Sequence, residues 1–197
     1  MDYISQIQSM AEKNGGVLIT GTVLAAGVSK YTLAEFLREN EYERVAHGIY
    51  CSPDCWRDDL YLLQLRCPQT VFSHDTALFL LDMTDREPLR YSVTAKTGYN
   101  PSHLTAEGIK VFTVKKELMD VGKMEAFTPF GHKVMTYGAE RTVCDMIRSR
   151  NTMEIQSVQD ALKQYIRRKD KNLQKLMEYA KLFHVEKRLY SYLEVLL

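Results

Sequence analysis

The sequence lacks the features of a secreted or membrane-inserted protein. No run approaches the roughly 18 consecutive apolar residues of a membrane span, and the N-terminus shows no basic segment followed by an apolar core. Cysteine is scarce, with Cys51, Cys55, Cys67 and Cys144 as the complete set. Without a secretory context these cysteines are expected to be reduced thiols. We therefore expect a cytoplasmic protein without membrane segments.

Two common site patterns are also missing. The Cys51 and Cys55 pair has the spacing C-x₃-C, but no second close pair follows it. A zinc site that also uses His47 and Cys67 is therefore the less favoured interpretation. The glycine pattern G-x-G-x-x-G of a dinucleotide-binding turn does not occur in the sequence. We expect neither a metal site nor a cofactor.

Three adjacent residues, Ser73, His74 and Asp75, are the residue types of a hydrolase triad. Neighbouring residues on a helix point about 100° apart, so they do not face one another as a triad requires. We interpret Ser73 as the cap of a buried helix and expect no catalytic residue.

The composition is that of a globular protein, with 45% hydrophobic and 26% charged residues over 197 positions. The net charge of +1 is unevenly distributed, because residues 1–56 carry −3 and residues 57–197 carry +4. Polar residues and Pro53 cluster between these two parts. We therefore expect two domains, 1–56 and 57–197, with Trp56 packed between them.

Residues 16–51 have the pattern of a winged helix-turn-helix. Gly27 occupies a turn that needs a residue tolerant of positive φ, and Val28 follows as its buried apolar residue. After Ser29, a favourable N-cap, apolar residues recur at the i, i+3 and i+4 positions of one helix face. Two short strands then flank a turn at His47, and a strand near residue 18 is expected to back them.

This pattern indicates DNA as the partner. A recognition helix places its N-terminal residues against base edges in the major groove, while a wing lies along the backbone. The expected base contacts are Lys30, Tyr31, Thr32 and Arg38, and the expected backbone contacts are Arg44, His47 and Tyr50. The same fold also serves as a protein-docking module, which stays as the alternative.

The charge of this part is unusual for a DNA-binding domain. DNA-binding domains are usually basic, so a net charge of −3 predicts that the few cations share one face or that other parts of the chain supply phosphate contacts. One module of this size reads only a few base pairs, so we expect two inverted or repeated half-sites. The chain has no heptad seam, and we expect a monomer in solution that pairs on DNA.

Residues 57–197 predict a small mixed or antiparallel sheet and a helical bundle, so the fold class is α+β. Residues 89–94 alternate as in a half-buried strand, and residues 109–114 predict a second, more buried strand. A hairpin is expected to join residues 122–127 to residues 133–137.

Helices are expected over residues 139–148 and through most of residues 155–196. The first of these should carry a charged face of Glu140, Arg141 and Asp145. Between residues 148 and 188, eleven basic residues occur with five acidic ones, a net charge of +6. Such a surface is usually only solvated, but it can also bind an acidic partner or a nucleic-acid backbone.

With these features in this order, the chain resembles the AbiEi family of antitoxins. The matching strings are His47-Gly48-Ile49-Tyr50, Phe72-Ser73-His74-Asp75-Thr76-Ala77-Leu78, Leu81-Asp82-Met83-Thr84-Asp85-Arg86-Glu87-Pro88 and Glu140-Arg141-Thr142-Val143-Cys144-Asp145. Their joint order, rather than any single string, makes the resemblance specific, and it covers essentially the whole chain.

The resemblance implies the antitoxin of a type IV toxin-antitoxin locus, an abortive-infection system of phage defence. Its N-terminal part would repress its own operon as a non-enzymatic transcriptional repressor. Its C-terminal part would neutralise a nucleotidyltransferase-like toxin, directly or through the toxin's substrate. The antitoxin surface is then expected among Arg148, Arg150, Arg167, Arg168, Lys169, Lys171 and Lys175.

Two alternatives stay open. One is a metal-dependent enzyme that processes nucleic acid with Asp82, Asp85, Glu140 and Asp145. These acids are scattered over turns and a helix, and Glu140 is better explained by the dipole of a helix N-terminus. The other is a plain transcriptional regulator without a toxin partner.

Overall fold

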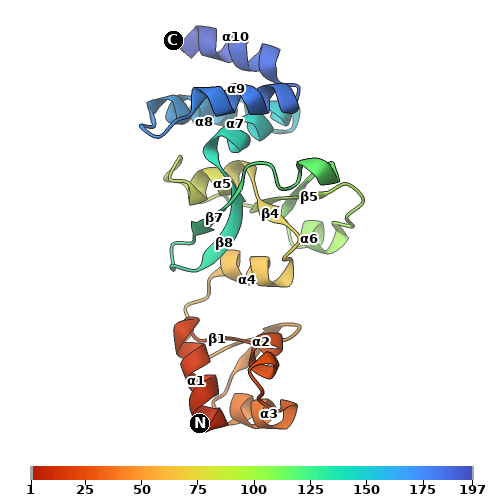
Figure 1. Ribbon diagram of the computed structural model, residues 1–197, viewed down its shortest axis with the longest axis vertical. Helices are drawn as coiled ribbons and strands as arrows, with labels where there is room; N and C mark the ends of the chain where they lie inside the picture. The colour runs from red at the N-terminus through yellow and green to blue at the C-terminus, as the bar shows by residue number, and fades with distance from the viewer. Residues whose placement is uncertain (1, 197) are drawn as a thin grey trace. The chain divides into compact units, whose positions relative to one another are not determined.

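A computed structural model describes residues 2–196, with side chains through Glu194, and Figure 1 labels its elements. The residues form two compact units. The first comprises the chain up to Cys67 together with Pro129–His132, and the second comprises Pro68–Thr128 and the chain from Lys133 onward. The first unit thus includes residues beyond the predicted range 1–56. Trp56 is 80% exposed, and its packing between the two predicted domains stays a prediction.

The first unit contains four helices and a small sheet. Its elements are α1 (Tyr3–Lys13), β1 (Val17–Ile19), α2 (Thr20–Ala25), α3 (Lys30–Glu39), β2 (Glu43–Ala46), β3 (Ile49–Cys51) and α4 (Asp59–Arg66). The sheet is antiparallel with the order β1-β3-β2. The helices and strands that we expected between residues 16 and 51 are therefore present.

Local signals explain the turn between α2 and α3. Gly27 has φ +89° and Val28 is 3% exposed, as expected for a glycine turn followed by a buried apolar residue. Ser29 is the N-cap of α3, because its Oγ accepts a hydrogen bond from the Thr32 N–H at 3.0 Å. These residues fix where α3 begins.

The core of the first unit lies among α1, α2 and α3. It contains Ile7, Ala11, Leu18, Val23, Val28, Leu33 and Phe36. Leu33 and Phe36 supply the buried face of α3. Tyr3 and Ile4 at the start of α1 are about half exposed. The buried face of α1 therefore begins at Ile7.

The second unit contains a mixed sheet and several helices. Its elements are β4 (Val71–Phe72), α5 (His74–Leu80), β5 (Ser92–Lys96), α6 (Ser102–Ala106), β6 (Lys110–Val114), η1 (Lys116–Leu118), β7 (Lys123–Phe127), β8 (Lys133–Tyr137), α7 (Ala139–Arg148), η2 (Arg150–Thr152), α8 (Ile155–Arg167), α9 (Leu173–Leu182) and α10 (Glu186–Leu196). The five-stranded sheet has the order β6-β5-β4-β8-β7 with parallel and antiparallel pairs. The α+β class is confirmed.

The two central predictions about the sheet need correction. The strand β5 begins at Ser92 rather than Leu89, and residues 92–95 are buried on both faces. Leu89 is fully exposed. The strand β6 lies at an edge and is less buried than β5, which reverses the predicted order. The burial of a strand depends on whether it lies at the centre or the edge of its sheet. That position is set by contacts between distant parts of the chain, so it could not be predicted from the local pattern.

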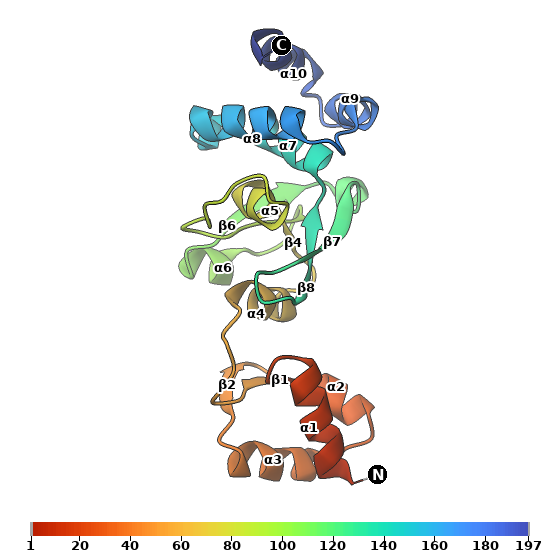
Figure 2. The ribbon, with the colours of Figure 1, turned by 90° about the vertical axis from the view of Figure 1, so that its left-hand side faces the viewer.

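The helices α7, α8 and α9 lie on one side of the sheet, as Figures 1 and 2 show. Helix α7 packs against α5, α8 and α9, and the core includes Val143, Met146 and Leu162. Ile155 and Leu173, the first residues of α8 and α9, are exposed. The buried apolar faces of these two helices therefore begin after their first residues.

The prediction of a charged, solvated face on α7 is wrong. Arg141 and Asp145 are fully buried and form an ion pair with Nε and Oδ2 2.8 Å apart. Arg141 Nη1 also donates to the carbonyls of Leu118 at 2.9 Å and Val121 at 2.6 Å. Its guanidinium lies 4.1 Å from the ring centre of Tyr137. Full burial of such a charge is tolerated because it is paired and hydrogen-bonded.

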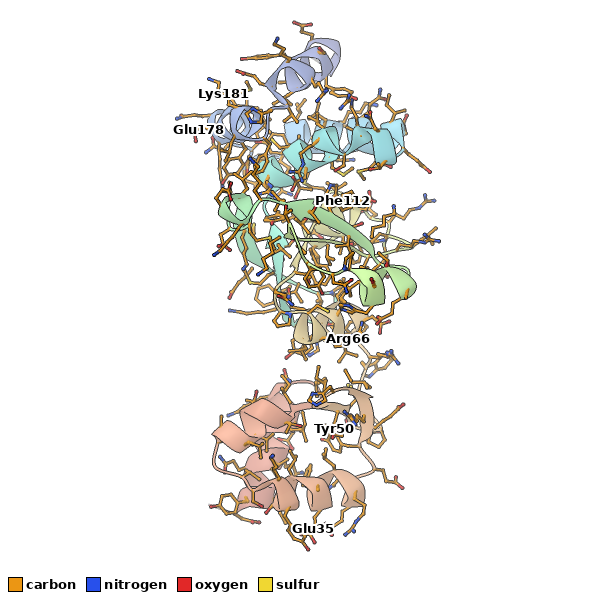
Figure 3. All side chains as sticks on the ribbon, turned by 90° about the vertical axis from the view of Figure 1, so that its right-hand side faces the viewer. Glu35, Tyr50, Arg66, Phe112, Glu178 and Lys181 are labelled. Carbon is orange, nitrogen blue, oxygen red and sulfur yellow. The ribbon has the colours of Figure 1, made fainter. Side chains whose placement is uncertain are left out.

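Ser73 and His74 form a buried polar network rather than a simple helix cap. His74 has φ +52°, so it does not have the helical backbone that we assumed, and its Nδ1 reaches Ser73 Oγ at 3.0 Å. Its Nε2 bonds Ser149 Oγ at 2.9 Å, and its ring stacks on Phe112 of β6 (labelled in Figure 3). Asp75 faces Lys110 instead, with their charged atoms 3.6 Å apart.

We expect His74 to make stability depend on pH. Burial, with the charges of Arg148 and Arg141, lowers the pKa of His74 to about 3, whereas unfolded histidine has a pKa near 6.5. Between these values the unfolded chain binds a proton that the folded chain does not, so unfolding becomes easier as pH falls below about 6.5. The loss is at most about 1.4 kcal/mol per pH unit.

The measurement compares the parent with His74→Asn by urea unfolding between pH 6.5 and 4.5. Asparagine tolerates the positive φ of this position, and other titrating groups are common to both proteins. The parent should lose more stability than the variant as pH falls. Equal pH slopes would contradict the assignment.

Candidate nucleic-acid interface

The surface of α3 that faces away from the core carries most of the predicted base contacts. Leu33 and Phe36 are buried, whereas Lys30, Tyr31 and Arg38 are exposed. Tyr31 has 72% of its surface accessible, so its ring and hydroxyl are open to a partner. The structure thus places these three residues together on the open side of α3.

Thr32 differs from the other predicted base contacts. Its hydroxyl lies 2.9 Å from Ser29 Oγ, and its N–H donates to the same oxygen. Because Thr32 is only partly exposed and takes part in the cap, we assign it to the start of the helix. Its role as a base contact stays a prediction.

The three predicted backbone contacts lie on the β2-β3 hairpin. Arg44 and His47 are exposed, whereas Tyr50 is on the middle strand and only partly exposed. Arg44 pairs with Tyr50 across the strands, and the register shifts between Arg44 and Ala46. Arg44 Nε donates to the Ala46 carbonyl at 3.3 Å. This hydrogen bond holds the guanidinium of Arg44 near the end of β2.

Two further residues of the same α3 surface, Ala34 and Glu35, were not among the predicted contacts. Ala34 is exposed and Glu35 is partly exposed, and both lie one turn beyond Tyr31. A hydrogen bond to Glu35 and the charge of this carboxylate raise the pKa of Tyr31. The spacing i, i+4 from Tyr31 could have identified Glu35 as a neighbour on this surface.

The predicted antitoxin residues fall into two groups in the second unit. The first has structural contacts: Arg148 Nη2 is 3.3 Å from Asp145 Oδ1, Arg168 donates to the Leu81 carbonyl and to Asp170, and Lys175 Nζ is 3.8 Å from Glu140 Oε2. The second group is exposed and lies at the end of α8 and in the turn before α9: Arg167, Lys169 and Lys171. Lys171 Nζ also donates to the Arg168 carbonyl at 3.1 Å. Arg150 is on η2 and partly exposed.

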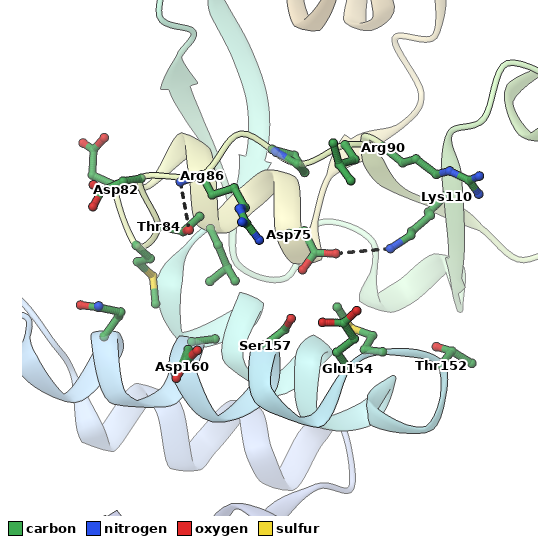
Figure 4. A pocket seen from close by; sticks show the side chains of 18 residues that line it. Asp75, Asp82, Thr84, Arg86, Arg90, Lys110, Thr152, Glu154, Ser157 and Asp160 are labelled. Carbon is green, nitrogen blue, oxygen red and sulfur yellow. Dashed lines mark hydrogen bonds and ion pairs between the residues drawn. The ribbon is translucent and has the colours of Figure 1, made fainter.

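A cavity of about 920 Å³ opens in the second unit (Figure 4). It is lined by the acids Asp75, Asp82, Asp85, Glu154 and Asp160, and by the cations Arg86, Arg90 and Lys110. The Asp75 and Lys110 side chains pair with each other. Burial raises the pKa of Asp75. Charges of both signs thus share the lining.

The four acids of the alternative enzyme are not all brought together: Asp82 and Asp85 line the cavity, whereas Glu140 and Asp145 do not. Asp145 pairs with Arg141, and Glu140 accepts hydrogen bonds from the Tyr165 hydroxyl and the Asn172 N–H. Among the described residues, no three His, Cys, Asp or Glu side chains are placed to hold a metal ion.

Cys51, Cys55, Cys67 and Cys144 form no disulfide bonds in the structure, as expected for reduced thiols. The pKa of Cys51 is raised to about 12, mainly by burial and to a smaller extent by the neighbouring Cys55. Within residues 2–196, no helix is both long and apolar enough to cross a membrane.

One family model matches the N-terminal part of the chain. Residues 5–53 match the model of a family described as "Transcriptional regulator, AbiEi antitoxin", which confirms the predicted resemblance to this family. No curated protein matches the chain.

Among solved structures, the chain is similar to the crystal structure of the RV2827C protein from Mycobacterium tuberculosis. The TM-score is 0.57 at 14% identity, over 98% of this chain and 80% of that chain. At this identity the likeness shows a shared fold.

Proposed function

We propose that this chain, which carries the AbiEi antitoxin family's regulator domain over residues 5–53, binds the promoter of its own operon and represses it. Residues 1–56 would act as a winged helix-turn-helix and residues 57–197 as the antitoxin domain. The latter would neutralise a nucleotidyltransferase-like toxin in the cytoplasm, directly or through the toxin's substrate. The protein would contribute to phage defence by abortive infection without enzymatic activity of its own.

The observation that carries the DNA-binding proposal is the open side of α3. This helix has ten residues and is therefore about 15 Å long, a length that fits the major groove. Lys30 lies at its N-terminus, where backbone N–H groups also favour a phosphate. Tyr31 and Arg38 are exposed on the same helix and can reach base edges.

The β2-β3 hairpin follows α3 directly in the chain and would serve as the wing. Arg44 and His47 are its exposed polar residues, and Arg44 can contact a phosphate while its stem is held by the Ala46 carbonyl. Because one such unit covers few base pairs, we propose two half-sites occupied by two copies that pair on DNA.

Arg38→Ala and Arg44→Ala should each weaken binding to the chain's own promoter and leave the fold intact. Both side chains are exposed. Loss of the Arg44 phosphate contact should flatten the slope of log K against log salt by about 0.9, whereas loss of the Arg38 base contact should weaken binding to the promoter. Fluorescence anisotropy with a promoter duplex over a range of salt concentrations measures both quantities.

The matched control is Lys13→Ala, which removes an exposed cation at the end of α1, outside the surface of α3 and the hairpin. It should bind as the parent does. If both arginine variants bind like the parent at ~0.15 M salt, a concentration at which exposed charges still act over ~8 Å, the recognition surface lies elsewhere.

A further inference from the structure

The centre of the open side of α3 is not basic. Positions 31, 34, 35 and 38 follow the helical spacing i, i+3, i+4 and i+7, so their side chains share one face. These residues are Tyr31, Ala34, Glu35 and Arg38. Figure 3 shows Glu35 on the side of α3 that faces away from the three-stranded sheet. A carboxylate therefore stands in the middle of the surface that would enter the groove.

Such a carboxylate is unfavourable for general attraction to DNA. It is repelled by phosphates, and the acceptor atoms of guanine and thymine in the major groove offer it no donor. The donors in the major groove are the N4 amino group of cytosine and the N6 amino group of adenine. Adenine also presents the acceptor N7 beside its amino group, which repels a carboxylate, so cytosine is the base from which Glu or Asp accepts. An acid at this position therefore contributes to sequence specificity and not to general affinity for DNA.

We propose that Glu35 is a specificity-determining residue that accepts a hydrogen bond from the N4 amino group of a cytosine in each half-site. The inference rests on the proposed promoter binding. Tyr31 is a positioning residue in this scheme, because it lies one turn before Glu35 on the same face of α3, where its hydroxyl can donate to the carboxylate and restrict it before DNA is bound.

Two consequences follow for binding. In the parent, replacing the contacted C·G pair by T·A should weaken binding about tenfold or more, since a good base contact discriminates by roughly 1–3 kcal/mol and 1.4 kcal/mol is tenfold. Removing the charge of Glu35 should reduce this discrimination, since a charged acceptor makes the stronger hydrogen bond, and strengthen binding to unrelated DNA.

The experiment uses the full chain with the parent sequence, Glu35→Gln and Tyr31→Phe. Each is titrated with a promoter duplex, with single C·G to T·A replacements across both half-sites, and with a scrambled duplex of equal length. Glu35→Gln keeps a neutral acceptor but removes the charge, so it should reduce the penalty at one position in each half-site and bind the scrambled duplex more tightly. Tyr31→Phe should reduce the same penalty in part.

Glu39→Gln is the matched control, because Glu39 is an exposed acid in the last turn of the same helix. It makes the same change in charge and should leave every base-pair penalty at the parent's value. The proposal is overturned if Glu35→Gln keeps the parent's penalties at all C·G pairs, or if Glu39→Gln removes the same penalty. A parent that does not prefer its promoter over the scrambled duplex overturns the proposed function itself, an outcome visible before any variant is measured.

Discussion

Arg141→Met is expected to lower the free energy of unfolding of the second unit by about 3–5 kcal/mol, the usual cost of removing one partner from a buried ion pair. The substitution removes the 2.8 Å partner of the buried Asp145 carboxylate and leaves Arg148, 3.3 Å from Asp145 Oδ1, as its remaining cation. It also leaves the carbonyls of Leu118 and Val121 without the donor that Arg141 supplies. Methionine keeps much of the volume between the rings of Tyr137 and Phe183, so lost packing contributes little.

Urea unfolding followed by circular dichroism measures this loss. Arg150→Met is the matched control, because Arg150 is a partly exposed arginine on η2 and such positions usually change stability by less than about 0.5 kcal/mol. Arg141→Lys keeps the charge without the planar donor geometry and should fall between the parent and Arg141→Met. A loss below about 1 kcal/mol for Arg141→Met would show that Asp145 finds another partner at little cost.

Much of the fold is predictable because its signals are local. The turn before α3 needs a glycine, and the cap needs a hydroxyl, so Gly27 and Ser29 fix the helix boundary from neighbouring residues alone. The hairpin of β7 and β8 and the limits of α7 follow in the same way from turn residues and the helical period. Predictions of this kind do not require knowledge of distant parts of the chain.

Burial could not be predicted in the same way. Ser92 and Thr94 alternate with apolar residues as if one face of the strand were solvated, yet β5 lies between β4 and β6 and both of its faces are covered. Similarly, the sequence pattern predicts that Arg141 is a surface residue. It is buried because the carbonyls of Leu118 and Val121 accept its hydrogen bonds. In both cases the deciding neighbours come from elements far away in the sequence.

The candidate interface shows the same division. The helical period placed Tyr31 and Arg38 on the open side of α3 from the sequence alone. It could not show that the Thr32 hydroxyl meets the Ser29 cap, or that Arg168 is held by the Leu81 carbonyl and Asp170. Charge counted along the chain therefore overestimated how many cations are available to a partner.

Reversing Arg167, Lys169 and Lys171 to glutamate is expected to abolish rescue from the cognate toxin while promoter binding is retained. These side chains are exposed in the turn between α8 and α9, and the reversal replaces three positive charges by three negative ones. An acidic partner attracted by this turn would then be repelled. Arg168 is left unchanged because its contacts with Leu81 and Asp170 are structural. Growth of cells that co-express the toxin and the full chain, at matched protein level, measures rescue.

The matched control reverses Lys96, Lys115 and Lys116, which are exposed elsewhere in the second unit. It makes the same change in net charge, so it should still restore growth if the location of the charge matters rather than its sum. Loss of rescue in both variants would indicate that the net charge of the protein is what the toxin or its substrate senses. Full growth with the turn variant would instead mean that these three residues form only a solvated helix turn, and the antitoxin surface would then have to lie outside them.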